Sequence, residues 1–183
     1  IAAPASFRPT SDGAAQDAAR DLLAAAPGEF VQFDGVAIGM TRGFTARAES
    51  ILRGRPVALL DWFVPDGDSP VGFAASDDQA RDAALSVIAA LSRGGLEITD
   101  RPGLIVTRTL AQIVNAAGDA VLEQVATEDG VDTALRFGAN YPFGPFAWAD
   151  RIGRREVVAT LDAIAVDTGE AIYRPSHYLR NQA

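Results

Sequence analysis

The spacing of apolar residues changes once along this chain of 183 residues, close to residues 100–103. Before this point, short apolar runs with the length of buried strands alternate with stretches that have the three- and four-residue spacing of amphipathic helices. After it, only the helical spacing continues. The sequence therefore predicts two domains: residues 1–100 with α/β character, and residues 101–183 that are all α-helical.

The first hundred residues predict a small sheet with helices. Strands are expected at 36–40, 57–61, 71–75 and 96–99, and helices at 11–26, 45–52 and 77–92. Gly54 is placed to end the second helix, and Ser76 to cap the third. Because strands that alternate with helices form parallel sheets, we expect a small parallel or mostly parallel sheet.

The remaining residues predict a helical bundle. Apolar residues from Val106 to Val125 keep a helical spacing over about five turns. Thr127 is an expected N-cap for a helix that ends at Gly138 and turns its apolar residues inward. These inward residues are expected to be Val131, Ala134 and Leu135.

Two further helices are expected downstream. Pro145 is suited to the first position of a helix, and residues 154–168 carry a longer amphipathic pattern that ends at Gly169.

Composition excludes several kinds of chemistry. The chain has no cysteine, and all 16 basic residues are Arg, so thiolate metal sites, a cysteine nucleophile and lysine catalysis are absent. A net charge of −8 argues against nucleic acid as a partner. No apolar stretch approaches the roughly 20 residues of a membrane span. A cytoplasmic location, which we expect, is compatible with the lack of cysteine. The start at Ile1, without Met or a signal pattern, suggests a fragment or a processed chain.

His177 is the single histidine. It could act as a general base, but no Asp or Glu lies within five residues to orient it, and a surface position in a terminal helix capped by Ser176 is the better explanation. No metal site is expected from one histidine and scattered carboxylates.

Three glycines surround the first predicted strand. Gly35, Gly39 and Gly43, followed by Asp61 at a strand end, echo a dinucleotide fold, but the G-x-G-x-x-G spacing is missing. A structural remnant of such a fold, or simple turn formation, is therefore the favoured explanation, and no cofactor is expected to bind this chain.

An ordered series of short motifs covers the second half. The motifs are Pro102-Gly103-Leu104-Ile105-Val106-Thr107-Arg108, Asn115-Ala116-Ala117, Val131-Asp132-Thr133-Ala134, Gly138-Ala139-Asn140-Tyr141-Pro142-Phe143-Gly144-Pro145-Phe146, Asp150 with Ile152-Gly153, and Tyr173-Arg174-Pro175-Ser176. In order and spacing they resemble the C-terminal helical domain of 3-hydroxyacyl-CoA dehydrogenases. Residues 1–100 resemble the reduced Rossmann-like domain of longer bacterial members, of the phenylacetate-degradation type of 3-hydroxybutyryl-CoA dehydrogenase.

The resemblance implies an oxidoreductase of fatty acid metabolism that passes hydride from a 3-hydroxyacyl-CoA to NAD. The family's catalytic His-Glu pair and glycine fingerprint lie in an N-terminal domain that is absent here, so NAD is expected in the full enzyme and no catalytic residue in this chain. Thr107 stands where the family has an Asn near the reacting carbonyl. The substrate contacts that the resemblance implies are Thr107, Asn140, Pro142, Phe143 and Pro145.

These observations predict the C-terminal portion of such a dehydrogenase. It would serve dimerisation and assembly, line the acyl-CoA cleft, and be inactive alone. Its partners would be N-terminal dehydrogenase domains or a second subunit, in a homodimer. The alternative is a stand-alone, non-enzymatic dimerisation or interaction module.

Overall fold

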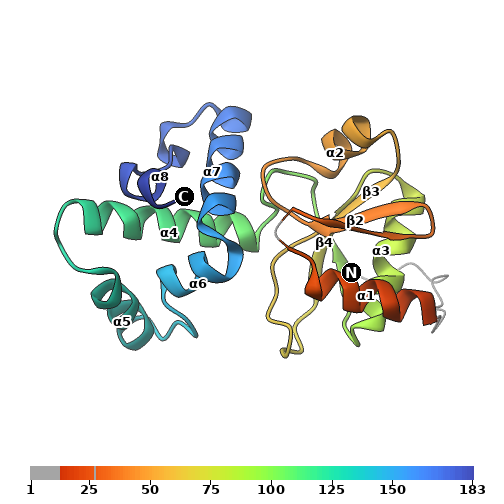
Figure 1. The fold of residues 1–183 in the computed structure, drawn as a ribbon, viewed down its shortest axis with the longest axis horizontal. Helices are drawn as coiled ribbons and strands as arrows, with labels where there is room; N and C mark the ends of the chain where they lie inside the picture. The colour runs from red at the N-terminus through yellow and green to blue at the C-terminus, as the bar shows by residue number, and fades with distance from the viewer. Residues whose placement is uncertain (1–12, 27) are drawn as a thin grey trace. The chain divides into compact units, whose positions relative to one another are not determined.

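The computed structural model describes residues 13–26 and 28–183, and the chain divides into two compact units. Unit 1 comprises the chain up to Thr41 and residues 45–104, and unit 2 comprises residues 42–44 and 105–183. Unit 1 holds the sheet and unit 2 is helical (Figure 1). The coarse prediction of an α/β part followed by an all-α part is confirmed, whereas folding of the two parts as separate domains stays a prediction.

Unit 1 contains three helices and five strands among its described residues. They are α1 (Gly13–Ala24), β1 (Phe30–Phe33), β2 (Val36–Met40), α2 (Ala46–Arg53), β3 (Val57–Leu60), β4 (Val71–Ala75), α3 (Asp78–Ala90) and β5 (Gly95–Glu97). The part of α1 predicted at residues 11–12 lies outside the described residues.

The sheet is mixed, which corrects the expectation of a parallel or mostly parallel sheet. Its strand order is β1-β2-β3-β4-β5. The pairs β2–β3 and β4–β5 are parallel, while β1–β2 and β3–β4 are antiparallel. The antiparallel pairs form because their connections, the turn at Asp34-Gly35 and the loop between β3 and β4, contain no crossover helix.

The first strand was not predicted. Asp34 and Gly35 both have a positive φ, 50° and 76°, which is the geometry of a tight type I′ hairpin turn. This turn brings Phe33 opposite Val36 and adds β1 to the edge of the sheet.

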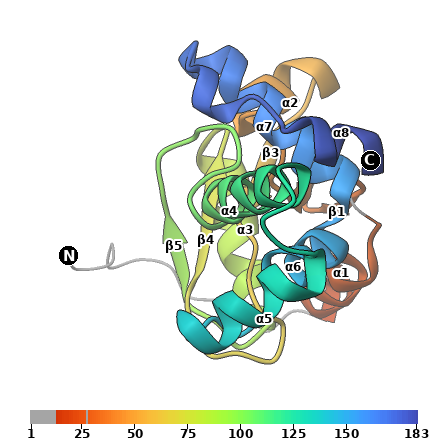
Figure 2. The ribbon, with the colours of Figure 1, turned by 90° about the vertical axis from the view of Figure 1, so that its left-hand side faces the viewer.

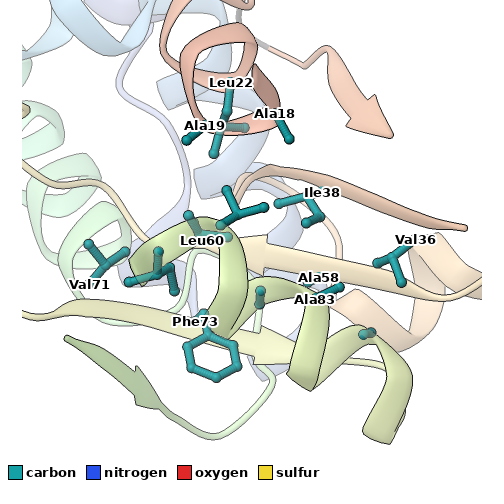
Figure 3. Packing of buried hydrophobic residues seen from close by; sticks show 14 residues of the cluster. Ala18, Ala19, Leu22, Val36, Ile38, Ala58, Leu60, Val71, Phe73 and Ala83 are labelled. Atoms are coloured by element: carbon teal, nitrogen blue, oxygen red, sulfur yellow. The ribbon is translucent and has the colours of Figure 1, made fainter. Parts of the chain in front are cut away.

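Alternate residues of the strands face opposite sides of the sheet. Val36, Ile38 and Leu60 pack with Phe73 on the face that α1 and α3 cover, as Figure 3 shows. The other face carries a smaller cluster made by Ala37, Ala46, Val57, Leu59, Ala74 and Leu104. The three central strands, β2, β3 and β4, are therefore buried on both faces, whereas β5 is exposed.

Two helix starts in unit 1 are capped by side chains. The Thr45 hydroxyl accepts from the backbone N–H of Ala48 at 3.1 Å, and Gly54 ends α2 with a φ of 63°, as predicted. The third helix is capped by Asp77, not by Ser76. Ser76 instead accepts a hydrogen bond from the backbone N–H of Val57 at 3.0 Å, which ties the end of β4 to β3.

Unit 2 contains five α-helices and one 3-10 helix. They are α4 (Val106–Leu122), α5 (Glu128–Gly138), α6 (Pro145–Ile152), α7 (Arg154–Thr168), η1 (Ala171–Tyr173) and α8 (His177–Gln182). Helices α6, α7 and α8 pack against α4, which Figure 2 shows end-on. The core is formed by Ala111, Val114, Ala117, Phe146, Ala149, Val157, Leu161 and Leu179.

Helix α5 departs from its predicted packing. Its bounds and its Thr127 cap are as expected, but none of its residues is buried. Val131 and Leu135 are half-buried and Ala134 is exposed. Val131 still packs against the core of unit 2, as predicted, and the side-chain hydrogen bonds of α5 to the rest of unit 2 are made by carboxylates of its first half.

The predicted first helix of this unit ends earlier than its apolar pattern suggests. Gln124 has a φ of 60°, which stops the helix, and Val125 beyond it is 73% exposed. Among the described residues no helix combines the length and apolar character that crossing a membrane requires.

Candidate functional site

The segment 139–146 links α5 to α6 and carries four of the five predicted contact residues. Asn140 has a φ of 55°, which turns the chain sharply after α5, and the Tyr141 backbone N–H donates to the Leu135 carbonyl at 3.3 Å. Pro142 is exposed, Phe143 is half-buried and Pro145 is buried at the first position of α6. The loop is thus held at both of its ends and open in its middle.

Asp132 of α5 holds the end of this loop that enters α6. Its two carboxylate oxygens accept from the backbone N–H groups of Phe146, at 2.9 Å, and Ala147, at 3.1 Å. The first N–H groups of a helix have no partner within the helix, and a carboxylate there also interacts favourably with the helix dipole. Asp132 therefore caps α6 from a neighbouring helix, a role that was not predicted from the sequence.

Two aromatic residues of the loop, Tyr141 and Phe143, contact side chains of α6. The Arg151 guanidinium lies 3.9 Å from the centroid of the Phe143 ring, and the Tyr141 and Trp148 rings lie 5.4 Å apart. Trp148 is buried, whereas Phe143 and Arg151 place an aromatic ring and a cation at the surface next to Pro142. Such a surface can contact the apolar and anionic parts of a ligand.

A network of charged and hydrogen-bonded side chains is centred on Arg154 and Glu128. Arg154 donates to both oxygens of Glu128, at 2.6 and 3.0 Å, and to Asp150 at 2.8 Å. The Tyr178 hydroxyl donates to Glu128 at 2.8 Å. The hydrogen bonds from Arg154, above all, lower the pKa of Glu128, and the bond to Glu128 raises the pKa of Tyr178. This network joins α5, α6, α7 and α8.

Thr107 lies apart from this loop in sequence, in the first turn of α4. Its side chain is 4% exposed, whereas Ile105 and Val106 before it are 58% and 39% exposed. Its contact with a ligand stays a prediction.

Each of the three glycines around β2, Gly35, Gly39 and Gly43, has a different structural role. Gly35 forms the hairpin turn, and a Cβ at Gly39 would overlap the Phe30 ring of β1 at 2.9 Å. A Cβ at Gly43 would meet the Ala159 carbonyl at 3.3 Å. Turn formation therefore accounts for Gly35, as the sequence suggested, whereas close packing, which was not predicted, accounts for Gly39 and Gly43.

The N-terminus of α2 follows β2, which is where a dinucleotide fold binds phosphate. Here the Asp100 carboxylate accepts from the backbone N–H groups of Ala46, at 2.8 Å, and Arg47, at 3.0 Å. With Thr45 bonded to Ala48, three of the first N–H groups of α2 are taken by side chains of unit 1 itself. An internal carboxylate thus fills the position of the anion.

His177 is exposed at the first position of α8, and Ser176 accepts from Leu179 at 3.2 Å as its N-cap. This placement is the surface position described above. Within residues 13–26 and 28–183, no group of three or more His, Asp or Glu residues is arranged to hold a metal ion.

Comparison with known proteins gives the helical unit a family. Residues 103–183 match the family model of the 3-hydroxyacyl-CoA dehydrogenase C-terminal domain. The chain is 36% identical over 152 residues to a 3-hydroxyadipyl-CoA dehydrogenase of Escherichia coli, which covers 83% of the chain and 32% of that protein. It is 31% identical over 109 residues to a probable 3-hydroxybutyryl-CoA dehydrogenase of Bacillus subtilis, covering 60% of the chain and 38% of the relative.

A solved structure extends the likeness. The crystal structure of a 3-hydroxybutyryl-CoA dehydrogenase from Escherichia coli matches with a TM-score of 0.79 and 34% identity, covering 87% of this chain and 34% of that one. Such coverage reaches well into unit 1, so both units have counterparts there. The chain spans about a third of the length of these relatives. From the match over residues 103–183, we conclude that these residues form a 3-hydroxyacyl-CoA dehydrogenase C-terminal domain.

Proposed function

We propose that this chain is the C-terminal portion of an NAD-dependent 3-hydroxyacyl-CoA dehydrogenase, cytoplasmic and acting on 3-hydroxybutyryl-CoA or a related thioester of phenylacetate degradation. It serves dimerisation and assembly, lines the acyl-CoA cleft, and has no catalytic residue of its own. The names of the relatives and the matched length of about a third support this assignment.

The observation that carries the assembly role is the packing of α5. The helix is strongly amphipathic, yet it buries no residue. Exposed apolar side chains lie at its end, with Phe137 at 80%, at the end of α4, with Leu122 at 48%, and between these two helices, with Val125 at 73%. We call these three residues the α5 apolar set. An interface at this helix would bury these side chains, and the buried core of an interface is rich in apolar residues.

The proposed partner is another dehydrogenase helical domain, in a second subunit of a homodimer or in the N-terminal dehydrogenase part of a longer chain. Such a partner would bring an equivalent apolar helix, and the interface would be isologous in a dimer. Sedimentation of the purified chain tests this role.

We expect a concentration-dependent dimer that Phe137→Asp weakens, because the change introduces a charge into the apolar contact. Val166→Asp, a matched change at an 86% exposed position of α7, should leave association unchanged. A chain that stays monomeric at high concentration, or a dimer that tolerates both changes equally, would contradict the role of α5.

The acyl-CoA cleft is proposed to be lined by the loop 139–146. Phe143 with its Arg151 neighbour and the exposed Pro142 support this, because a thioester brings both an apolar chain and anionic groups. Thr107 and Asn140 complete the proposed contacts, and the buried Pro145 contributes by starting α6.

NAD is proposed to bind the full enzyme and not this chain. The carboxylate of Asp100 at the N-terminus of α2 supports this, since its negative charge would repel a pyrophosphate there.

The alternative is a stand-alone interaction module without a ligand, and the uncovered α5 apolar set fits it equally. Calorimetric titration with acetoacetyl-CoA separates the two. Saturable binding at micromolar concentration supports the dehydrogenase portion, while the absence of heat at millimolar ligand favours the module.

A further inference from the structure

Phe146, at the start of α6, is fixed by groups from three other helices. Its backbone N–H donates to Asp132 of α5, the Arg154 guanidinium of α7 lies 5.6 Å from its ring centroid, and the Tyr178 ring of α8 meets its ring edge-on at 6.2 Å. The side chain is 3% exposed. The point at which the loop enters α6 is therefore the most constrained part of the loop.

Asp132 replaces a local cap that the sequence of α6 lacks. Gly144 is the N-cap residue and has no side chain to accept a hydrogen bond, and Pro145 has no N–H. The next two N–H groups, of Phe146 and Ala147, are the ones that Asp132 binds.

Gly144 makes this arrangement possible. A Cβ at residue 144 would overlap the carboxyl group of Asp132, although the φ of −75° at this position suits any residue. The glycine is thus required by the approach of Asp132 and not by its own backbone conformation. The Gly144-Pro145-Phe146 motif and Asp132, which are distant in sequence, together form the N-terminal cap of α6.

Asp132 and Glu128 lie four residues apart, on the same side of α5. One carboxylate binds the backbone of α6 and the other binds Arg154 and Tyr178, which contact the ring of Phe146. Both carboxylates of this helix side therefore act on the entrance of α6. Helix α5 thus provides the two carboxylates, of Glu128 and Asp132, that hold the start of α6.

We propose that Asp132 is the positioning residue of the acyl-CoA contact loop: by holding the N-terminus of α6, it fixes residues 140–144 so that Pro142 and Phe143 meet the thioester in one arrangement. This inference rests on the proposed function of the loop. It assigns Asp132 no contact with the substrate.

The loop depends on this anchor for a geometric reason. Its first end is held by the backbone N–H groups of Ala139 and Tyr141, which both donate to the Leu135 carbonyl, at 3.1 and 3.3 Å, while its second end is held by two charge-assisted bonds to the Asp132 carboxylate. Loss of the second anchor allows residues 140–144 to sample several conformations. A ligand must then order them when it binds, which weakens affinity without removing a contact.

The test compares Asp132→Asn with Asp129→Asn in the full chain. Both changes remove one carboxylate charge from α5, but Asp129 is exposed in the first turn, whereas the amide introduced by Asp132→Asn keeps only one oxygen to accept from two N–H groups. Backbone NMR gives order parameters for residues 140–144 and exchange rates for the amides of Phe146 and Ala147. Calorimetry gives the affinity for acetoacetyl-CoA.

For Asp132→Asn we expect about tenfold faster exchange at one or both of these amides, lower order parameters at 140–144, and about tenfold weaker acetoacetyl-CoA binding. Asp129→Asn should match the wild type in all three. Gly144→Ala, which crowds the carboxylate, should reproduce the Asp132→Asn pattern.

The outcomes separate the two proposals. Unchanged order parameters at 140–144 in Asp132→Asn overturn the positioning role, and so does wild-type affinity together with a disordered loop. If the wild-type chain binds no acetoacetyl-CoA, the cleft-lining function fails, and the exchange rates and order parameters still decide whether Asp132 positions the loop.

Discussion

The side-chain amide of Asn115 on α4 binds the backbone on both sides of Pro175, accepting from the Ser176 N–H at 2.8 Å and donating to the Arg174 carbonyl at 3.0 Å. Asn115 is 4% exposed and Ser176 6% exposed. The pair fixes the turn that leads into α8.

Replacing Asn115 with Ala should destabilise the chain by about 2–4 kcal/mol, because a buried N–H and a carbonyl lose their partners together. Urea unfolding of the variant measures the change. Gln112→Ala is the control, since the exposed bond from Gln112 reaches the Ile172 carbonyl of the same segment. Equal losses for the two variants would contradict the role of the buried pair.

Gly118→Ala should disturb the packing of α8 against α4 and lower the unfolding free energy. A Cβ at Gly118 would lie 2.6 Å from the Ser176 hydroxyl and 3.1 Å from Leu179 Cγ, so α8 has to shift. We expect a loss of about 1–3 kcal/mol in unfolding free energy, the range for overpacking. Gly138→Ala, where a Cβ meets nothing within 4 Å, should be neutral or slightly stabilising. The prediction fails if the two glycines tolerate alanine alike.

The carboxylate of Glu128 should make stability depend on pH in the acidic range. Hydrogen bonds from Arg154, chiefly, lower the pKa of Glu128 in the folded state. A lowered folded pKa contributes stability that is present above the unfolded pKa, about 4.3, and is lost as the pH falls through the folded value. Unfolding free energy measured from neutral to acidic pH should fall less steeply for Glu128→Gln than for the wild type.

Glu123→Gln, at the exposed end of α4, is the matched control and should keep the wild-type slope. A wild-type slope in Glu128→Gln would show that the network with Arg154 and Tyr178 adds no acid sensitivity.

Asp100→Ala should weaken unit 1 through the start of α2. The change leaves the N–H groups of Ala46 and Arg47 without their carboxylate, and the loss of an N-terminal cap costs about 1–2 kcal/mol. Amide exchange at these two residues should rise with the loss in unfolding free energy. Asp66→Ala, in the exposed loop after β3, should leave both unchanged. Protection of Ala46 in Asp100→Ala equal to that of the wild type would refute the capping role.

Local signals in the sequence predicted most elements of the fold. The bounds of β2 and α7 and the Thr127 cap of α5 follow from apolar spacing and capping chemistry, which act between near neighbours. Strand β1 could also have been found, because Asp-Gly between two apolar runs is a hairpin signal. The direction of β4 could not, since apolar strands look alike in parallel and antiparallel pairs.

In the candidate site, too, the local motif could be found in the sequence, whereas the long-range contacts could not. The motif from Gly138 to Phe146 was visible in the sequence, with Pro145 at the expected start of a helix, but the partner of Gly144 was not. Asp132 lies 14 residues from Phe146, and its bond depends on how α5 and α6 pack. The same holds for Asp100, which binds Ala46 across 54 residues of sequence. Contacts of this range are set by tertiary structure and leave no spacing pattern.

The assignment of this chain as the non-catalytic C-terminal portion of a dehydrogenase is tested most directly by NAD-linked turnover. Purified chain is incubated with 3-hydroxybutyryl-CoA and NAD, and the formation of NADH is followed by absorbance. We predict no NADH above the enzyme-free control, because His177 is exposed without a neighbouring acid in sequence and Asp100 fills the N-terminus of α2. Saturable NADH formation by the isolated chain would contradict the account.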